Sequence, residues 1–326
     1  MKYRQLGKTG LFISEIGLGC WAMGGPSVSE QGVPSGWAAP DPGEIIEGIR
    51  RGVQSGVNHF DNADVYGNGQ AERLLASALG PHRSQVIISS KVGYLRGSAP
   101  QAYDPLHIRH QCEQSLKNLD RDWIDIYYLH HADFGPDDCF CDEAVETMQR
   151  LKSEGKIRCI GFSAYSVKDF VRLIPRIQPE VVQSWAHCMD YHFIAPGSPL
   201  MNICQENGIS FIAFSPINQG ILSGKYLPAN PPDFGAGDHR SRSEKFKPEY
   251  LVRAQRGLHL LREHFGEFST DLIRVALQFV LYHDNVGGVI PGFRSAKQVK
   301  ELCAGADSML SGSDIAFVRK AFSQQL

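Results

Sequence analysis

The sequence predicts a (β/α)8 barrel, or TIM barrel, formed by residues 1–326 as a single domain. Short apolar strands alternate with amphipathic helices about eight times, which is typical of parallel strands joined by right-handed crossovers. A length of 326 residues suits one barrel with inserted loops. Eight units favour a closed barrel over the alternative, a doubly wound open sheet. Outside the barrel, residues 3–16 predict a β-hairpin around Gly7–Gly10, and residues 315–322 predict an extra C-terminal helix.

The first predicted helix shows how the elements are recognised. Asp41 can cap it, Pro42 suits its first turn, Glu44 has the capping-box spacing, and Gly56 ends it. By the same signals, Ser166, Ser269 and Ser295 are predicted N-caps, and Gln298 completes a capping box with Ser295. Further helices are predicted over residues 70–80, 105–119, 142–155, 199–208 and 271–281. Strands are predicted over residues 17–19, 59–61, 85–91, 123–130, 157–163, 181–185, 209–215 and 286–292.

Composition and charge exclude several classes of protein. With 42% hydrophobic and 21% charged residues, the composition is that of a globular protein. A net charge of −2 does not suggest nucleic acid or an anionic membrane as a partner, so we expect neither. No apolar run reaches the roughly 18 residues that span a bilayer, and the N-terminus has no signal-peptide block, so we expect a cytoplasmic protein. The eight scattered cysteines are expected to be reduced and structural.

Two long loops, 23–40 and 218–247, are expected to be functional lids or disordered. No feature of the sequence specifies an oligomeric state.

Polar residues stand where six successive predicted strands end. In a barrel these carboxyl ends form the rim that carries the active site. One polar strand end means little, but six that converge on one rim are hard to explain by packing. The series is Asp61, Lys91, His130, Ser163, Gln183 and Ser215.

Four residues of this rim suit proton transfer to a carbonyl oxygen. An ammonium such as Lys91, held by Asp61, is expected to lower the pKa of Tyr66 from its ordinary value near ~10. Tyr66 could then donate a proton while His130 hydrogen-bonds the same oxygen, and a nicotinamide cofactor would supply hydride. The alternatives are a structural salt bridge between Asp61 and Lys91, a Schiff-base aldolase with Lys91 as the nucleophile, and a nucleotide-binding regulatory module.

The spaced motifs resemble the aldo-keto reductase family, including its bacterial-type members and its potassium-channel β subunits. FDNADVYG resembles the motif around the family's Asp and Tyr, SSKVG its lysine segment, and IDIYYLH its histidine strand. The resemblance implies a catalytic tetrad of Asp61, Tyr66, Lys91 and His130. It also implies reduction of an aldehyde or ketone to an alcohol with NADP(H), with NAD(H) as the alternative.

The resemblance further implies a cofactor groove. GFSAY resembles a Gly-x-Ser-Asn-Phe segment, FSPINQGILSGKY a segment that stacks on nicotinamide and contacts the pyrophosphate, and IPGFRSAKQVKE the adenosine-phosphate segment. Three positions depart from the pattern: Ala164 for Asn, Phe214 for Tyr and Leu302 for Asn. The expected cofactor contacts are Gly19, Cys20, Trp21, Asp61, Ser163, Gln183, Phe214, Ser215, Pro216, Gly220, Leu222, Gly224, Lys225, Pro291, Gly292, Phe293, Arg294, Gln298 and Glu301.

Substrate and cofactor choice depend on fewer residues. Arg294, near the start of a helix, is predicted to hold the 2′-phosphate of NADPH, with a solvated surface role as the alternative. Aromatic residues predict a pocket for small carbonyl compounds, among them sugar-like ones, although ordinary packing explains them equally well. They are Trp21, Trp37, Tyr94 and Trp185, with His187 beside them.

Two groups of residues near the rim are given structural roles. His131 points to the opposite side of its strand from His130, so we expect it to be packed or exposed. The acidic loop with Cys139 and Cys141 lacks zinc spacing and is expected to be a solvated rim loop, with no metal.

Overall fold

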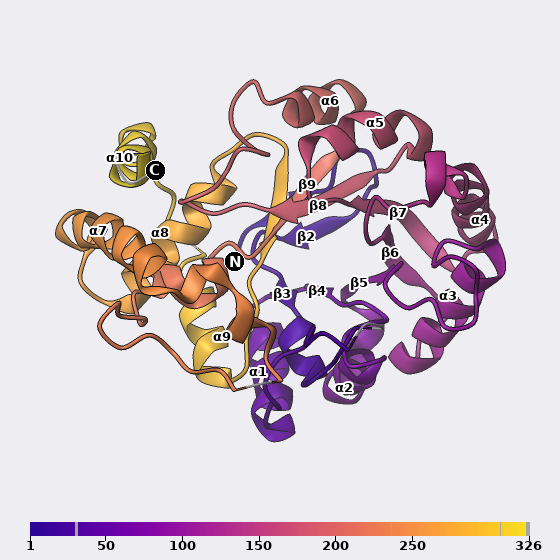
Figure 1. The fold of residues 1–326 in the computed structure, drawn as a ribbon, viewed down its shortest axis with the longest axis horizontal. Helices are drawn as coiled ribbons and strands as arrows, with labels where there is room; N and C mark the ends of the chain where they lie inside the picture. Colours follow the sequence, from indigo (N-terminus) through magenta and orange to yellow (C-terminus); the bar gives the residue numbers. More distant parts are fainter. Residues whose placement is uncertain (30–31, 236, 307, 324–326) are drawn as a thin grey trace.

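Figure 1 shows a ring of strands surrounded by helices in a computed structural model of the chain. The structure describes residues 1–29, 32–235, 237–306 and 308–323. Residues 30–31 and 236, which belong to the two predicted loops, lie outside the described residues, as does the predicted domain end at 326.

Within the described residues, eight parallel strands follow one another around the barrel in chain order. Gly17 N–H donates to Val289 O at 2.8 Å, and Gly19 N–H donates to Pro291 O at 3.0 Å, so the first and last strands also meet. This closure confirms the predicted (β/α)8 barrel. The strands are β3 (Leu18–Gly19), β4 (His59–Asp61), β5 (Ile87–Val92), β6 (Ile124–Leu129), β7 (Ile157–Ser163), β8 (Val181–Trp185), β9 (Ser210–Phe214) and β10 (Val286–Ile290).

The helices pack their apolar faces on the outside of the barrel (Figure 1). Their predicted starts are mostly confirmed. The Asp41 carboxylate accepts from Gly43 N–H at 2.8 Å and from Glu44 N–H at 3.2 Å. The Ser166 hydroxyl accepts from Asp169 N–H at 3.1 Å. The helices are α1 (Pro42–Gln54), α2 (Gln70–Leu79), α3 (Pro105–Leu119), α4 (Cys141–Ser153), α5 (Val167–Ile177), α6 (Pro199–Asn207), α7 (Pro248–Phe265), α8 (Ser269–Leu281), α9 (Ala296–Cys303) and α10 (Gly312–Ser323).

The predicted hairpin, β1 (Tyr3–Gln5) with β2 (Phe12–Ser14), covers one end of the barrel. Leu6 and Ile13 are fully buried and pack with residues that fill the barrel interior, such as Ile126. Gly7 has φ +44°, and a Cβ there would lie 2.2 Å from Gly208 O, so the turn requires glycine. Because the hairpin fills the amino-terminal end, the carboxyl ends of the strands form the accessible rim.

Two local predictions were wrong. Ser269 is the first residue of α8 rather than its cap, and Phe268 N–H donates to the Asp271 carboxylate at 3.2 Å instead. The Gln298 side chain accepts from Arg294 N–H at 2.7 Å, one residue before the predicted capping-box partner Ser295. In both cases a longer acceptor side chain in the first turn reaches back to satisfy a free backbone donor.

The helix α7 was missed, and the predicted loop 218–247 is only partly irregular. This loop contains 3-10 turns at Asn218–Ser223, His239–Arg242 and Glu244–Phe246. In α7, Gly257 interrupts the apolar face because the Phe322 ring packs directly on it, 2.3 Å from where a Cβ would lie. A glycine in mid-helix hides the helical pattern when only the sequence is inspected. None of the described helices is both long enough and apolar enough to cross a bilayer.

Candidate active site

The six polar strand ends meet at the rim, as predicted. β4 ends at Asp61 and β5 carries Lys91, and these strands are hydrogen-bonded neighbours. One cavity of about 450 Å3 opens at this rim. Five of the six residues line it, namely Asp61, His130, Ser163, Gln183 and Ser215. The sixth, Lys91, is fully buried and is bound to Asp61.

Lys91 is the centre of a buried hydrogen-bonded group. Its Nζ donates to Asp61 Oδ2 at 2.5 Å, to Asn62 O at 2.7 Å and to Tyr66 OH at 3.3 Å. The other carboxylate oxygen of Asp61 accepts from Gln183 Nε2 at 2.8 Å. A buried ion pair is tolerated only when its remaining donors and lone pairs are satisfied, and here both partners have them satisfied.

The environment of Tyr66 differs from the expectation drawn from the sequence. Burial raises the pKa of Tyr66 well above its ordinary value near 10, and the negative charge of Asp61 raises it further. The prediction that Lys91 lowers this pKa was therefore wrong, because desolvation of a phenolate outweighs the nearby ammonium. Tyr66 therefore keeps its proton at neutral pH, with the Lys91 Nζ 3.3 Å from its hydroxyl.

His130 stands opposite Tyr66 as a neutral imidazole. Burial lowers its pKa well below 6.5, and the charge on Lys91 adds to this effect. The ring centroids of Tyr66 and His130 lie 6.0 Å apart. His130 Nδ1 is buried without a partner among the described residues. A neutral imidazole offers one N–H donor. Tyr66 and His130 can therefore both donate a hydrogen bond to one ligand oxygen placed between them.

His131 has the structural environment expected of it. Its Nε2 lies 2.7 Å from Gly93 O. Its ring packs against Tyr94 and Tyr103 at centroid distances of 4.9 Å each. Since these contacts hold the loop after β5, His131 supports the rim rather than the cavity wall.

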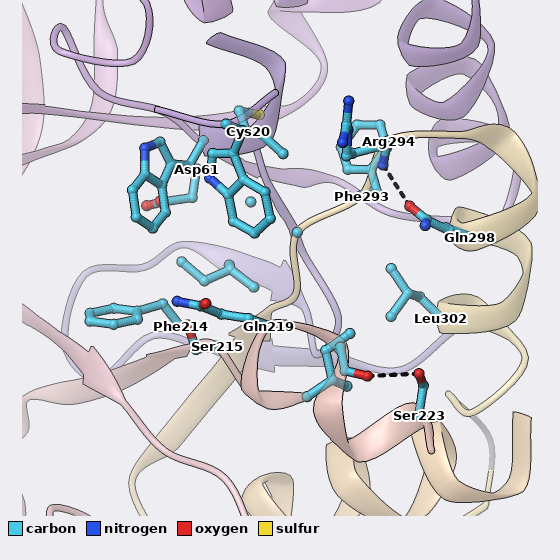
Figure 2. A pocket seen from close by; sticks show the side chains of 18 of the residues that line it. Cys20, Asp61, Phe214, Ser215, Gln219, Ser223, Phe293, Arg294, Gln298 and Leu302 are labelled. Carbon is cyan, nitrogen blue, oxygen red and sulfur yellow. Dashed lines mark hydrogen bonds between the residues drawn. The ribbon is translucent and has the colours of Figure 1, made fainter. Parts of the chain in front are cut away.

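The cavity extends from this acid–base group toward α9. Figure 2 shows Asp61 and Phe214 on one side of the pocket, Arg294, Gln298 and Leu302 on the other, and Gln219 between them in this view. The predicted cofactor residues that line it are Gly19, Cys20, Trp21, Asp61, Ser163, Gln183, Phe214, Ser215, Gly220, Lys225, Gly292, Phe293, Arg294, Gln298 and Glu301. The wall does not include Pro216, Leu222, Gly224 or Pro291 among the described residues.

Several wall residues were not identified from the sequence. Ile217, Ile273 and Ile290 are apolar and carry no chemical signature that separates them from core residues. Arg240 belongs to the long loop, and its burial depends on an ion pair with Asp238 at 2.6 Å. The wall residues not identified from the sequence are Ala22, Tyr165, Ile217, Gln219, Ser223, Arg240, Ser269, Ile273 and Ile290.

Three features of the cavity suit a nucleotide ligand. A Cβ on Gly292 would meet nothing closer than Gly19 O at 4.0 Å, so the backbone there is open to a ligand. Four cationic residues line the cavity, Lys225, Arg240, Arg294 and Lys297, and they can face phosphate groups. Gln219 Oε1 is buried without a partner among the described residues, which a ligand in the cavity could supply.

Arg294 is already engaged. Its guanidinium NH2 donates to Ala38 O at 3.1 Å and to Ala39 O at 2.9 Å. These bonds tie the turn before α9 to the loop after β3, so the half-buried side chain is not free in solvent. The other terminal nitrogen is not used in these contacts.

Only part of the predicted substrate wall faces the cavity. Trp21 and Trp37 line it, and the Trp21 ring lies 6.1 Å from the Tyr66 ring. Within the described residues, Tyr94, Trp185 and His187 are not part of the wall. Trp185 Nε1 donates to Asp190 at 2.8 Å, His187 is buried, and Tyr94 packs against His130, so each supports its surroundings.

The loop with Cys139 and Cys141 is held by ion pairs. Asp138 accepts from Arg172, and Arg176 Nη2 lies 2.9 Å from Asp142 Oδ1. Across the described part of the chain, no group of three or more His, Cys, Asp or Glu side chains is placed to hold a metal. All eight cysteines are free thiols.

A buried Asp–Lys–Tyr group at the rim of a (β/α)8 barrel, beside a cavity with cationic residues in its wall, stands where barrel enzymes carry their active sites. The chain belongs to the aldo/keto reductase family, whose profile matches residues 15–322. It is therefore an oxidoreductase of a family that acts on carbonyl compounds with nicotinamide cofactors.

Individual relatives agree with this assignment. The L-glyceraldehyde 3-phosphate reductase of Escherichia coli (strain K12) is 28% identical, over 92% of this chain and 86% of its own length. The NADH-specific methylglyoxal reductase of the same strain is 28% identical, over 98% of each chain. The structure of an aldo-keto reductase from Bacillus halodurans in its holo form has a TM-score of 0.77 and 26% identity, and covers 98% of this chain and 96% of its own.

Proposed function

We propose that this protein reduces a small aldehyde or ketone to an alcohol, with Tyr66 as the proton donor and NADPH as the preferred cofactor. One observation carries the proposal: Lys91 Nζ contacts Asp61 at 2.5 Å and Tyr66 OH at 3.3 Å beneath a cavity that His130 also lines. The nicotinamide nucleotide, when bound, supplies hydride to the carbonyl carbon.

The residues of this chain would manage the oxygen of that carbonyl. His130, neutral because of burial, donates a hydrogen bond that orients and polarises it. Tyr66 transfers its proton as negative charge develops on the oxygen, and the Lys91 ammonium then stabilises the phenolate. Asp61, held by Gln183, keeps the ammonium in place.

Several wall residues would hold the nucleotide. Ser163 and Gln183 lie beside the acid–base group, where they would bind the carboxamide, and Phe214 would stack on the nicotinamide ring. Arg294, at the opposite side of the pocket, would face the 2′-phosphate with one terminal nitrogen while the other holds Ala38 and Ala39. NADH remains the alternative because one relative, the methylglyoxal reductase, is described as NADH-specific.

The contacts of Lys91 argue against an aldolase. A Schiff-base lysine attacks with a free lone pair, which requires a neutral amine. The Lys91 nitrogen instead makes three hydrogen bonds as donor, one of them to a buried carboxylate.

We also propose the cytoplasm as the site of action, since eight free thiols suit a reducing compartment.

The test is a panel of small aldehydes, ketones and sugars incubated with NADPH or NADH, followed by loss of reduced-cofactor absorbance. We expect turnover of several aldehydes, and loss of that turnover in Tyr66→Phe. Tight nucleotide binding without turnover of any carbonyl would contradict the proposal and favour a nucleotide-binding regulatory module.

A further inference from the structure

Two tyrosines meet at the rim of the cavity. Tyr94 follows β5 and Tyr165 follows β7, and their hydroxyl oxygens lie 3.3 Å apart, with Tyr94 as the donor. Tyr165 lines the cavity together with Tyr66 and His130. Tyr94 is not part of the cavity wall, and its ring packs edge-on against the His130 ring with the centroids 4.6 Å apart. The pair therefore extends the wall from the histidine that faces the reacting oxygen.

The pair leaves one donor available to a ligand. A phenol has one O–H to donate and an oxygen that can accept. The Tyr165 oxygen accepts from Tyr94, while the Tyr165 proton has no acceptor among the described residues. Tyr165 is 48% exposed, so this proton is open to whatever enters the cavity mouth.

The Tyr165 ring and its hydroxyl have separable roles. The ring lies 6.0 Å from Trp185 and 6.1 Å from Phe214, so packing on two aromatic neighbours fixes its position. A phenylalanine at position 165 would pack in the same way but would offer no donor. The hydroxyl is thus an addition that packing does not require.

We propose that Tyr165 is a specificity-determining residue that donates a hydrogen bond to a hydroxyl on the carbon next to the substrate carbonyl, so that 2-hydroxyaldehydes are the favoured substrate class. Tyr94 is a positioning residue that orients the Tyr165 hydroxyl. The inference rests on the proposed function. Its physical basis is that a site built to hydrogen-bond a substrate hydroxyl discriminates against the analogue that lacks it.

The test compares 2-hydroxypropanal with propanal, which differ by a single hydroxyl. For wild type and each variant, kcat/KM for 2-hydroxypropanal is divided by kcat/KM for propanal, both measured with saturating NADPH. Tyr165→Phe should lower this ratio by about three- to tenfold, as expected for one neutral hydrogen bond. Tyr282→Phe, a half-exposed tyrosine at the end of α8 and outside the cavity wall, is the matched control and should keep the wild-type ratio.

A second variant tests the role of Tyr94. Tyr94→Phe should lower the ratio less than Tyr165→Phe does, and it should have little further effect in the double variant, because it acts through Tyr165. A wild-type ratio in Tyr165→Phe, or additive losses in the double variant, would overturn the inference. If the wild-type protein reduced neither aldehyde nor any other carbonyl, the proposed function itself would fail, which is a different result from an unchanged ratio.

Discussion

Gln183 Nε2 and Asp61 Oδ1 lie 2.8 Å apart, and they join β8 to β4 across the barrel. Because Lys91 takes the other oxygen of the same carboxylate, Asp61 is held from two sides. The glutamine that the sequence assigned to the cofactor therefore also positions the ion pair. In Asp61→Asn the Gln183 amide can rotate so that its oxygen accepts a hydrogen bond from the new asparagine amide.

Tyr66→Phe should lower kcat by more than about a hundredfold, since general acid catalysis contributes a factor on that order or larger. The affinity for NADPH should stay within a few-fold, because the lost hydroxyl faces the substrate oxygen. Stopped-flow turnover and fluorescence titration of NADPH measure the two effects. Retention of most of kcat would exclude Tyr66 as the proton donor.

Lys91→Met should be more damaging than Asp61→Asn. The first leaves the Asp61 carboxylate buried without its cation, which costs about 3–5 kcal/mol in the free energy of unfolding. The second keeps a carbonyl oxygen for Lys91, and Gln183 can rotate to face the new amide. Urea unfolding and kcat should rank both variants in the same order, and equal losses would argue against a coupled group.

The pH profile should distinguish this group from a plain salt bridge. Asp61 raises the pKa of Tyr66, so removing its charge in Asp61→Asn should lower that pKa. Reduction requires the protonated phenol, so the alkaline limb of kcat should move to lower pH in the variant. An alkaline limb at the wild-type position would show that Tyr66 does not sense Asp61.

His130→Ala and His131→Ala form a matched pair. His130→Ala should lower kcat/KM for every carbonyl by roughly 2–4 kcal/mol of transition-state stabilisation, the usual loss for one oxyanion donor. His131 binds Gly93 O instead, so His131→Ala should lower the unfolding temperature more than the rate. A larger kinetic effect from His131 would reverse the assignment.

Asp64→Asn should change how stability depends on pH. Burial raises the pKa of Asp64 well above 3.8, and Glu72 adds to this rise, so the folded protein retains a proton that the unfolded chain loses near pH ~4. Wild-type stability therefore falls as the pH rises from that value toward the folded pKa. The asparagine variant does not ionise and should become increasingly stable relative to wild type over this range. Urea unfolding at several pH values checks this, with exposed Asp122→Asn as the control; a constant difference would contradict it.

Arg294→Ala should weaken NADPH more than NADH. A charge-assisted contact to the 2′-phosphate of NADPH contributes about 1.5–3 kcal/mol to binding. NADH has no 2′-phosphate and cannot make this contact. Loss of the bonds to Ala38 and Ala39 should weaken both nucleotides by a smaller, shared amount. Calorimetric titration of both nucleotides separates the two effects. Equal weakening would show that Arg294 acts only through the loop.

The sequence by itself determined the barrel fold and which polar residues stand at the carboxyl ends of its strands. Alternating strands and helices specify this fold because hydrophobic periodicity and caps are local properties. Polar residues at strand ends converge because parallel strands all point the same way. The sequence did not reveal α7, where Gly257 conceals the helical pattern and only its contact with Phe322, far along the chain, explains the glycine.

Tertiary structure alone decided how the rim residues act on one another. The raised pKa of Tyr66 depends on burial by elements distant in sequence, and local reasoning placed it in the wrong direction. The bond from Gln183 to Asp61 and the bonds from Arg294 to the loop after β3 join residues more than a hundred positions apart. Such contacts depend on side-chain geometry after the barrel has closed, which no periodicity in the sequence encodes.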